Sequence, residues 1–270
     1  MTDTRLVRRL FDDLAFEYDQ HLPFFATYGR ELVAWCGLRK GQKVLDLAAG
    51  RGAITGPAAR AVGAQGEVLA VDNAPNMLRA LVADLGDLPQ VSTRVMDVHA
   101  LDLPDASFDV VTCGFTLHFL DDPARVLAEA HRVLRPGGLL AFSGPATGRA
   151  QAPAGEDDGW AFYGRLMAET GQRTSRCNPF TPPSRPLPEL CAEAGFTGVE
   201  EHDARTWFAF RDPQHHWDWN MSHGFRGFVE SLEPELAEEF KTRMFEGLAR
   251  LHAAGGIVVQ STVAFTKVWK

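Results

Sequence analysis

The stretch "VLDLAAGRG", residues 44–52, constrains the fold more than any other part of the sequence. In it a short apolar run ends in Asp46, immediately before a glycine-rich turn. The Ala-rich segment "ITGPAARAVG" follows, and then "EVLAVD", a second apolar run that ends in Asp72. Two such runs around a helical segment predict a βαβ unit. A ligand is expected at the carboxyl end of its first strand, where the sheet opens a crevice.

Asp46 also indicates the charge of that ligand. A dinucleotide-binding turn in the same register would have glycine at position 55, which is Thr55, and Gly56 is out of register. A pyrophosphate over the helix N-terminus would meet the Asp46 carboxylate as a like charge, whereas an ammonium group would be attracted. S-adenosylmethionine carries both an ammonium and a sulfonium group. Thr55 and Asp46 therefore disfavour a nicotinamide oxidoreductase.

The alternation of strands and helices continues along the chain. "VSTRVMDV" and "FDVVTCGF" predict two more strands, "PARVLAEAHRVLRPGG" predicts a helix that stops at Pro136 and Gly137, and "LLAFSGP" predicts a fifth strand. Two helices are expected before the first strand, because apolar side chains recur there at helical spacing. This order indicates an α/β fold with a doubly wound, mostly parallel sheet. The β-branched segment 257–270 is expected to return as a hairpin at the sheet edge.

Two segments interrupt this alternation. One is rich in Gly, Pro and polar residues, and the other combines an aromatic, histidine-rich stretch with an amphipathic helix. The predicted organisation is a helical prelude or lid at 1–40, a cofactor-binding core at 41–146, a cap insertion at 147–186, a core helix and strand at 187–210, a substrate-lid insertion at 211–256 and a final core strand at 257–270.

Composition narrows the class of protein. With 45% hydrophobic residues the chain can bury a core, and its formal net charge of −8 argues against sequence-independent nucleic-acid binding. No apolar run approaches the roughly 18 residues of a membrane span, and the first residues lack a signal-peptide core. We expect a cytoplasmic protein with a small-molecule partner, no nucleic-acid or membrane partner, and a monomeric or homodimeric state.

The four cysteines, Cys36, Cys113, Cys177 and Cys191, are scattered along the chain. They show neither the paired spacing of a zinc site nor the density of a disulfide scaffold. We expect reduced thiols packed as small apolar groups, and no bound metal.

Together these motifs resemble the class I, seven-stranded, Rossmann-like S-adenosylmethionine-dependent methyltransferases of small-molecule type, over Val44 to Pro145. "VLDLAAGRG" is similar to the first motif of that family, although Ala48 stands where glycine is usual. Asp72 in "VLAVDNAPNML" is similar to the acid that accepts hydrogen bonds from both ribose hydroxyls. The resemblance implies a sheet of seven strands, with helical and aromatic lid insertions after strands 5 and 6.

The resemblance also implies S-adenosylmethionine as cofactor and S-adenosylhomocysteine as product. It places the second-strand residues beside the adenine and ribose, the fourth-strand backbone beside the methionine part, and an aromatic side chain of the prelude over the cofactor. The cofactor-binding residues so implied are Tyr18, Asp46, Ala48, Gly50, Gly52, Asp72, Asn73, Met77, Asp97, Val98, Cys113 and Gly114.

The insertions carry many aromatic residues, where this resemblance places substrate caps. A dry, apolar lid favours methyl transfer, which needs in-line approach of nucleophile, methyl carbon and sulfur. The acceptor is therefore expected to be a small hydrophobic or aromatic metabolite of secondary metabolism, methylated on oxygen, nitrogen or carbon. The candidate substrate-binding residues are Phe24, Trp160, Tyr163, Trp217, Trp219 and Phe225.

A hydroxyl acceptor would need a general base, and histidine is the side chain that titrates nearest neutrality. The candidates are His118, after the fourth strand, and His216 and His223 in the second insertion. An amine or an activated carbon would need no base. A different hypothesis is that the fold uses the cofactor structurally while its lid templates another reaction, such as a cyclisation.

Overall fold

Seven strands form one sheet in the computed structural model, which describes residues 4–146, 160–173 and 185–270. Their order across the sheet is β3-β2-β1-β4-β5-β7-β6. The strands are β1 Lys43–Leu47, β2 Glu67–Asp72, β3 Val91–Val95, β4 Phe108–Gly114, β5 Leu134–Pro145, β6 Thr197–Phe210 and β7 Ile257–Trp269. The first five are parallel, and β7 runs antiparallel to both of its neighbours. This confirms the predicted α/β fold.

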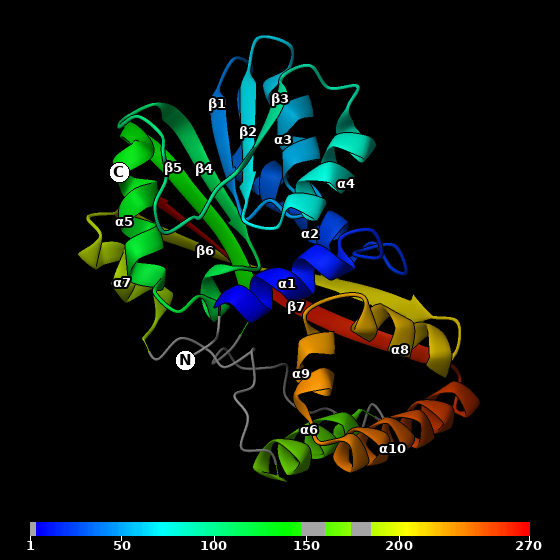
Figure 1. The fold of residues 1–270 in the computed structure, drawn as a ribbon. Helices are drawn as coiled ribbons and strands as arrows, with labels where there is room; N and C mark the ends of the chain where they lie inside the picture. The colour runs from blue at the N-terminus through cyan, green and yellow to red at the C-terminus, as the bar shows by residue number, and fades with distance from the viewer. Residues whose placement is uncertain (1–3, 147–159, 174–184) are drawn as a thin grey trace.

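Helices cover both faces of the sheet (Figure 1). Around the core they are α1 Thr4–Leu14, α2 Phe24–Cys36, α3 Thr55–Val62, α4 Pro75–Leu85, α5 Pro123–Val133 and α7 Leu187–Glu193, with a short 3-10 helix at Leu117–Phe119. Successive residues of β1 belong to the two layers, because Val44 is part of the apolar cluster that includes α2 and α3, whereas Leu45 is part of the cluster that includes α5 and α7. The two helices predicted before the first strand are present.

A second group of helices lies at the end of the molecule to which β6 and β7 extend (Figure 1). They are α6 Ala161–Arg173, α8 Pro213–Met221, α9 Phe225–Ser231 and α10 Pro234–Ala253. Proline at the start of α8 and α10 fits the first helical turn, and Asp212 caps α8 by accepting a hydrogen bond from the backbone of His215 at 2.7 Å. Most of the predicted cap insertion, and Cys177 within it, lie outside the described residues.

The position of β7 differs from the prediction. The segment was expected at the sheet edge, but β7 lies between β5 and β6, and β6 forms the edge. The physical reason is that β7 is apolar on both faces, with Phe265 buried in one layer and Val268 in the other. The first six residues of β6 are exposed, as an edge strand allows.

The boundary between α5 and β5 also differs from the prediction. The helix ends at Val133, and the strand starts at Leu134, so that Pro136 and Gly137 lie within β5 instead of stopping the helix. The pairing with β4 shifts register at this point, and Gly137 has φ of 75°. The backbone N–H of Gly137 donates to the carbonyl of Lys270 at 2.8 Å, which holds the irregular segment against the end of β7.

Candidate functional site

The Asp46 carboxylate ends β1 and is almost completely buried, with 1% of its surface exposed. Both of its oxygens are occupied, because the Thr55 hydroxyl donates to Oδ2 at 2.6 Å and the Thr112 hydroxyl donates to Oδ1 at 2.8 Å. Burial raises the pKa of Asp46 to about 6, against the opposing effect of these hydrogen bonds. Thr55 thus occupies the third glycine position of a dinucleotide-binding turn and holds the acid in place.

The turn between β1 and α3 requires glycine at two positions. Gly50 has φ of 52° and Gly52 has φ of 89°, in the region that favours glycine. A Cβ at Gly52 would also lie 2.9 Å from Leu85 Cδ1. Ala48 has φ of 49°, so it adopts a conformation that costs an alanine free energy. The residue that departs from the family's usual glycine is therefore strained.

Asp72 connects this turn to the end of β2. Its Oδ2 accepts a hydrogen bond from the backbone N–H of Gly50 and its Oδ1 accepts one from Ala74, both at 2.8 Å. The side chain is 8% exposed, and burial raises its pKa. Each carboxylate oxygen keeps a further lone pair, so the group can still accept hydrogen bonds from a diol.

A cavity of about 530 Å³ lies over these carboxyl ends of the strands. Of the cofactor-binding residues expected from the sequence, the lining includes Tyr18, Asp46, Ala48, Gly50, Gly52, Asp72, Asn73, Met77, Val98 and Gly114. Two are outside the lining. Cys113 is buried within the sheet, and the Asp97 carboxylate pairs with His99, which itself lines the cavity.

Aromatic rings form another part of the cavity lining. Phe24 lies 5.6 Å from Phe115 and 5.5 Å from Trp219, measured between ring centroids, and Tyr18 stacks on Phe25 at 4.7 Å. All five rings line the cavity. Phe25 and Phe115 were not predicted, although each directly follows a predicted residue in the sequence. One cavity therefore has both polar and aromatic residues in its lining.

Asp19 is a further lining residue that was not predicted. It has φ of 59°, and its carboxylate accepts hydrogen bonds from the backbone of Phe25 at 3.0 Å and of Ala26 at 2.8 Å. These bonds satisfy backbone donors in the first turn of α2. Burial raises the pKa of Asp19 to about 6, against the effect of the same hydrogen bonds.

Four predicted substrate residues lie outside the cavity lining. Trp160 packs against Tyr163, and its Nε1–H donates to the carbonyl of Val258 at 2.8 Å. Trp217 is buried against α10, and Phe225 is buried beside two other rings of α9 and α10. Their aromatic surface packs helices α6, α8, α9 and α10 into an apolar cluster that also includes one face of the sheet. Phe24 and Trp219 alone of the six line the cavity.

The three predicted histidines occupy two environments. His118 and His223 line the cavity, whereas His216 is buried in α8, where Asn220 Nδ2 lies 3.1 Å from its Nδ1. Burial lowers the pKa of His118 to about 4, that of His216 to about 4 and that of His223 to about 3. All three rings are therefore neutral at neutral pH.

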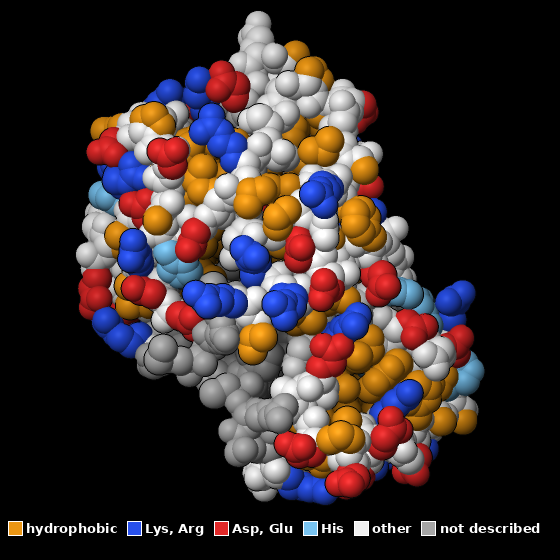
Figure 2. All heavy atoms as spheres, viewed as in Figure 1, with side chains coloured by type: hydrophobic (Ala, Val, Ile, Leu, Met, Phe, Trp, Pro, Cys, Tyr) orange, Lys and Arg blue, Asp and Glu red, His pale blue; other side chains and the backbone are white. Residues whose placement is uncertain are grey.

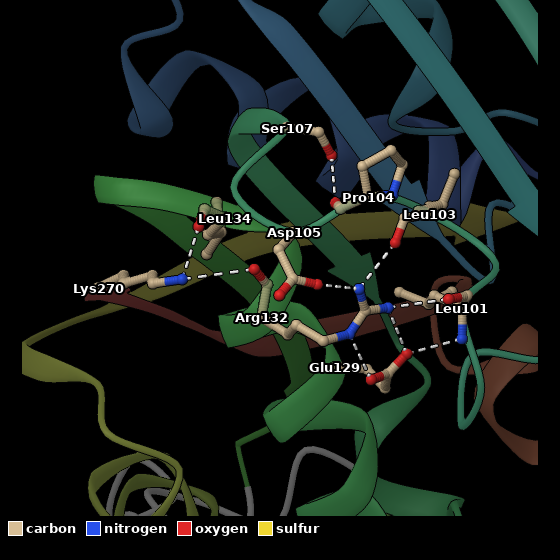
Figure 3. Close-up of polar contacts among 9 residues, drawn as sticks. All are labelled: Leu101, Leu103, Pro104, Asp105, Ser107, Glu129, Arg132, Leu134 and Lys270. Atoms are coloured by element: carbon tan, nitrogen blue, oxygen red, sulfur yellow. Dashed lines mark hydrogen bonds and ion pairs between the residues drawn. The ribbon is translucent and has the colours of Figure 1, made fainter.

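The loop between β3 and β4 follows no regular structure, and an arginine of α5 holds its backbone (Figure 3). Arg132 donates to the carbonyl of Leu101 at 2.8 Å and to that of Leu103 at 2.7 Å. It also pairs with Glu129 and Asp105, and Glu129 in turn accepts the N–H of Leu101 at 2.8 Å. This bracing satisfies backbone groups that no helix or sheet pairs.

The first residues of the same loop lie at the cavity. Val98 and His99 line the cavity, and Arg125 of α5 donates to the carbonyl of His99 at 2.7 Å. Two arginines of one helix therefore fix the loop that closes the polar end of the cavity.

Other kinds of site find little support in the described residues. No group of three His, Cys, Asp or Glu side chains there is arranged to hold a metal ion. None of the helices in the described ranges is long and apolar enough to cross a membrane. Figure 2 shows acidic and basic side chains interspersed over the face in view.

Comparison with known proteins agrees with this geometry. A family model described as a methyltransferase domain matches residues 45–142. Nocamycin O-methyltransferase from Saccharothrix syringae is 32% identical over 262 residues, which cover 92% of this chain and 92% of that protein. A ubiquinone/menaquinone biosynthesis C-methyltransferase from Psychromonas ingrahamii is 37% identical over 155 residues, covering 53% of this chain and 62% of that protein.

A solved structure shares the fold. It is phosphoethanolamine N-methyltransferase 2 of Haemonchus contortus in complex with S-adenosylhomocysteine, with a TM-score of 0.54 and 16% identity over 90% of this chain and 52% of that one. Sheet order, strand-end acids and glycine turn define a Rossmann-like, cofactor-binding α/β fold. The chain belongs to the class I S-adenosylmethionine-dependent methyltransferases, and S-adenosylmethionine is its cofactor.

The residues at the polar end fit that cofactor. The glycine turn lets a ligand approach the backbone closely, because Gly50 has open space where a Cβ would stand. Asp72 retains acceptor capacity for hydroxyl groups, and the buried Asp46 carboxyl lies where a cationic group would favour its ionised form.

Proposed function

We propose that this methyltransferase acts on a small hydrophobic or aromatic metabolite of secondary metabolism. The observation that carries the proposal is that one cavity is lined both by polar strand-end residues and by aromatic rings. In this proposal the strand-end residues hold the cofactor, and the rings of Phe24, Phe25, Phe115 and Trp219 hold the acceptor. Residues 211–256 then serve as the substrate lid, since they supply Trp219.

The bound cofactor supplies an electrophilic methyl group on a sulfonium sulfur. The protein contributes position and dryness. Asp72 and the glycine turn fix one reactant, and the aromatic wall fixes the other, so that both are held in near-attack geometry. The same wall excludes water, which would compete with the acceptor.

His118 is the candidate general base if the acceptor is a hydroxyl group. It lines the cavity, and its neutral ring at neutral pH can accept a proton. Its lowered pKa makes it a weak base, so we expect most of the rate to come from positioning. The relatives include an O-methyltransferase and a C-methyltransferase, which supports either acceptor atom.

The test is a screen of candidate metabolites with methyl-labelled S-adenosylmethionine. We expect S-adenosylhomocysteine and a labelled product from apolar aromatic acceptors, and neither from small polar amines or amino acids. Turnover of the polar compounds alone would contradict the substrate class. A changed acceptor without S-adenosylhomocysteine would instead support the templating hypothesis.

A further inference from the structure

Two buried nitrogen atoms in the aromatic wall have hydrogen-bonding capacity that the protein leaves unused. Within the described ranges, Trp219 Nε1 and His223 Nε2 are buried without a hydrogen-bond partner. Trp219 belongs to α8, His223 lies between α8 and α9, and both line the cavity. Their ring centroids are 4.8 Å apart. They form one polar spot in a wall of rings.

Both nitrogens are donors. The backbone N–H of Phe225 donates to Nδ1 of His223 at 3.4 Å, so Nδ1 holds a lone pair. Burial lowers the pKa of His223 to about 3, and the nearby His216 lowers it further, so the ring is neutral. A neutral imidazole that accepts at Nδ1 carries its hydrogen on Nε2, and the indole nitrogen of Trp219 only donates.

Buried polar groups of α8 that do not line the cavity have partners within the protein. Asn220, also buried in α8, donates to the carbonyl of His216 at 2.9 Å, and neither of these residues lines the cavity. Folded proteins pair nearly all buried polar atoms, because an unpaired one costs free energy. Two adjacent buried donors, on residues that line a cavity, therefore indicate an acceptor atom on a ligand.

We propose that the N–H groups of Trp219 and His223 together bind one carbonyl oxygen of the methyl-accepting substrate. This inference rests on the proposed function and narrows the substrate to a planar, apolar ketone or quinone. Phe24 lies 5.5 Å from Trp219, and Phe25 lies 5.8 Å from His223, between ring centroids. Among these rings a neutral carbonyl is bound more readily than a carboxylate, whose burial would cost far more free energy.

Such a pair also sets orientation. Trp219 is held between Phe24 and Phe210, and His223 is held against Trp219 itself, so the two donors are fixed by packing. An oxygen bound by both has one preferred position in the aromatic end. With that oxygen fixed, the shape of the substrate determines where its methyl-accepting atom lies, and in-line methyl transfer needs that atom in a defined position.

The test uses two probes that differ by one carbonyl group, 1-tetralone and tetralin, in calorimetric titrations of the full chain with S-adenosylhomocysteine present. We expect the wild-type protein to bind 1-tetralone at least about tenfold more tightly than tetralin. Trp219→Phe and His223→Phe should each reduce this preference, and the double variant should abolish it while its affinity for tetralin stays within about twofold.

A matched control is the Trp35 and His202 pair, whose ring centroids are 5.9 Å apart outside the cavity lining. The double variant Trp35→Phe, His202→Phe should keep the wild-type preference. Equal affinity of the wild-type protein for the two probes, or a preserved preference in the cavity double variant, would overturn the proposal. Methyl transfer is assayed separately, so a carbonyl preference without methylation of apolar acceptors would overturn only the proposed substrate class.

Discussion

Asp46 indicates the charge of the ligand, and it also holds neighbouring elements of the fold together. Its carboxylate is held by hydroxyl groups from two directions, one on α3 and one on β4. The sequence predicted its place and its incompatibility with a pyrophosphate. It could not predict Thr112 as a partner, because that contact joins residues that only the sheet brings together.

Asp72 is the proposed acceptor for the hydroxyl groups of the cofactor, and its removal tests that role. We expect Asp72→Ala to weaken S-adenosylmethionine binding by about tenfold to a hundredfold, since hydrogen bonds to a charged group contribute about 1.5–3 kcal/mol. Calorimetry measures the affinity, and Asp102→Ala, an exposed acid outside the cavity lining, is the control. Unchanged affinity in folded Asp72→Ala protein would show that Asp72 does not hold the cofactor.

Ala48 offers a test of backbone strain. A left-handed conformation costs an L-residue about 1–2 kcal/mol, whereas glycine makes the unfolded chain more flexible by about 0.4–1 kcal/mol. We therefore expect Ala48→Gly to raise the free energy of unfolding, by up to about 1 kcal/mol in denaturant titrations, and to retain cofactor binding. Ala106, with φ of 50° in an exposed turn, is the matched control, and Ala106→Gly should be stabilised similarly. A loss of stability in Ala48→Gly alone would mean that its methyl group packs usefully.

At the scale of elements, the loop between β3 and β4 depends on one helix. We expect Arg132→Met to lower the free energy of unfolding by about 1–3 kcal/mol and to speed hydrogen exchange in residues 98–106, because loop carbonyls lose their donors.

The control for this prediction is Arg185, which pairs with both oxygens of Glu193 on the surface. Arg185→Met should leave exchange in the loop unchanged, since an exposed ion pair contributes little. Equal exchange rates in the wild-type protein and in Arg132→Met would show that the loop is fixed by its apolar side chains instead.

Element types followed from the sequence wherever periodicity and turn residues agreed. The positions of the strands were harder to predict. Pro136 and Gly137 read as a helix stop, but pairing with the end of β7 places them in a strand. Strand order depends on contacts between residues far apart in the sequence. The only local sign that β7 lies between β5 and β6 is that apolar residues occupy both of its faces.

The candidate site divides in the same way. Its polar end comes from motifs at fixed spacing, so most of those residues were predictable. Its aromatic part is assembled from α2, α8 and the end of β4. Composition alone could not separate rings that line the cavity from rings that pack helices α6, α8, α9 and α10 together. Trp217 and Trp219 are two positions apart, yet one packs on α10 and the other lines the cavity.

At the scale of the whole molecule, three carboxyl groups that line one cavity predict an unusual response to pH. Burial raises the pKa of Asp19 and Asp46 to about 6 and also raises that of Asp72. A carboxyl that keeps its proton longer in the folded chain stabilises the fold fully below pH of about 4, and this contribution is lost as pH rises through about 6.

We therefore expect the free energy of unfolding of the cofactor-free protein to include a component that falls between pH 4 and 6, measured by urea titration at each pH. Asp46→Asn should reduce the fall of the unfolding free energy with pH. Part of the fall should remain in this variant, because Asp19 and Asp72 still contribute to it. An identical slope in Asp46→Asn would contradict the raised pKa of this group. Asp102→Asn, at the exposed acid outside the cavity, should leave the slope unchanged.

The placement of β7 also governs how the molecule assembles. β5 and β7 are neighbours in the sheet, but all of α6 to α10 lies between them in the chain. Closing so long a loop is entropically costly and slow, so β5 keeps a bare edge until the last strand arrives. An open edge of this kind can pair with another copy. Refolding yield should therefore depend on protein concentration, with dilution favouring closure of the sheet within one chain over aggregation.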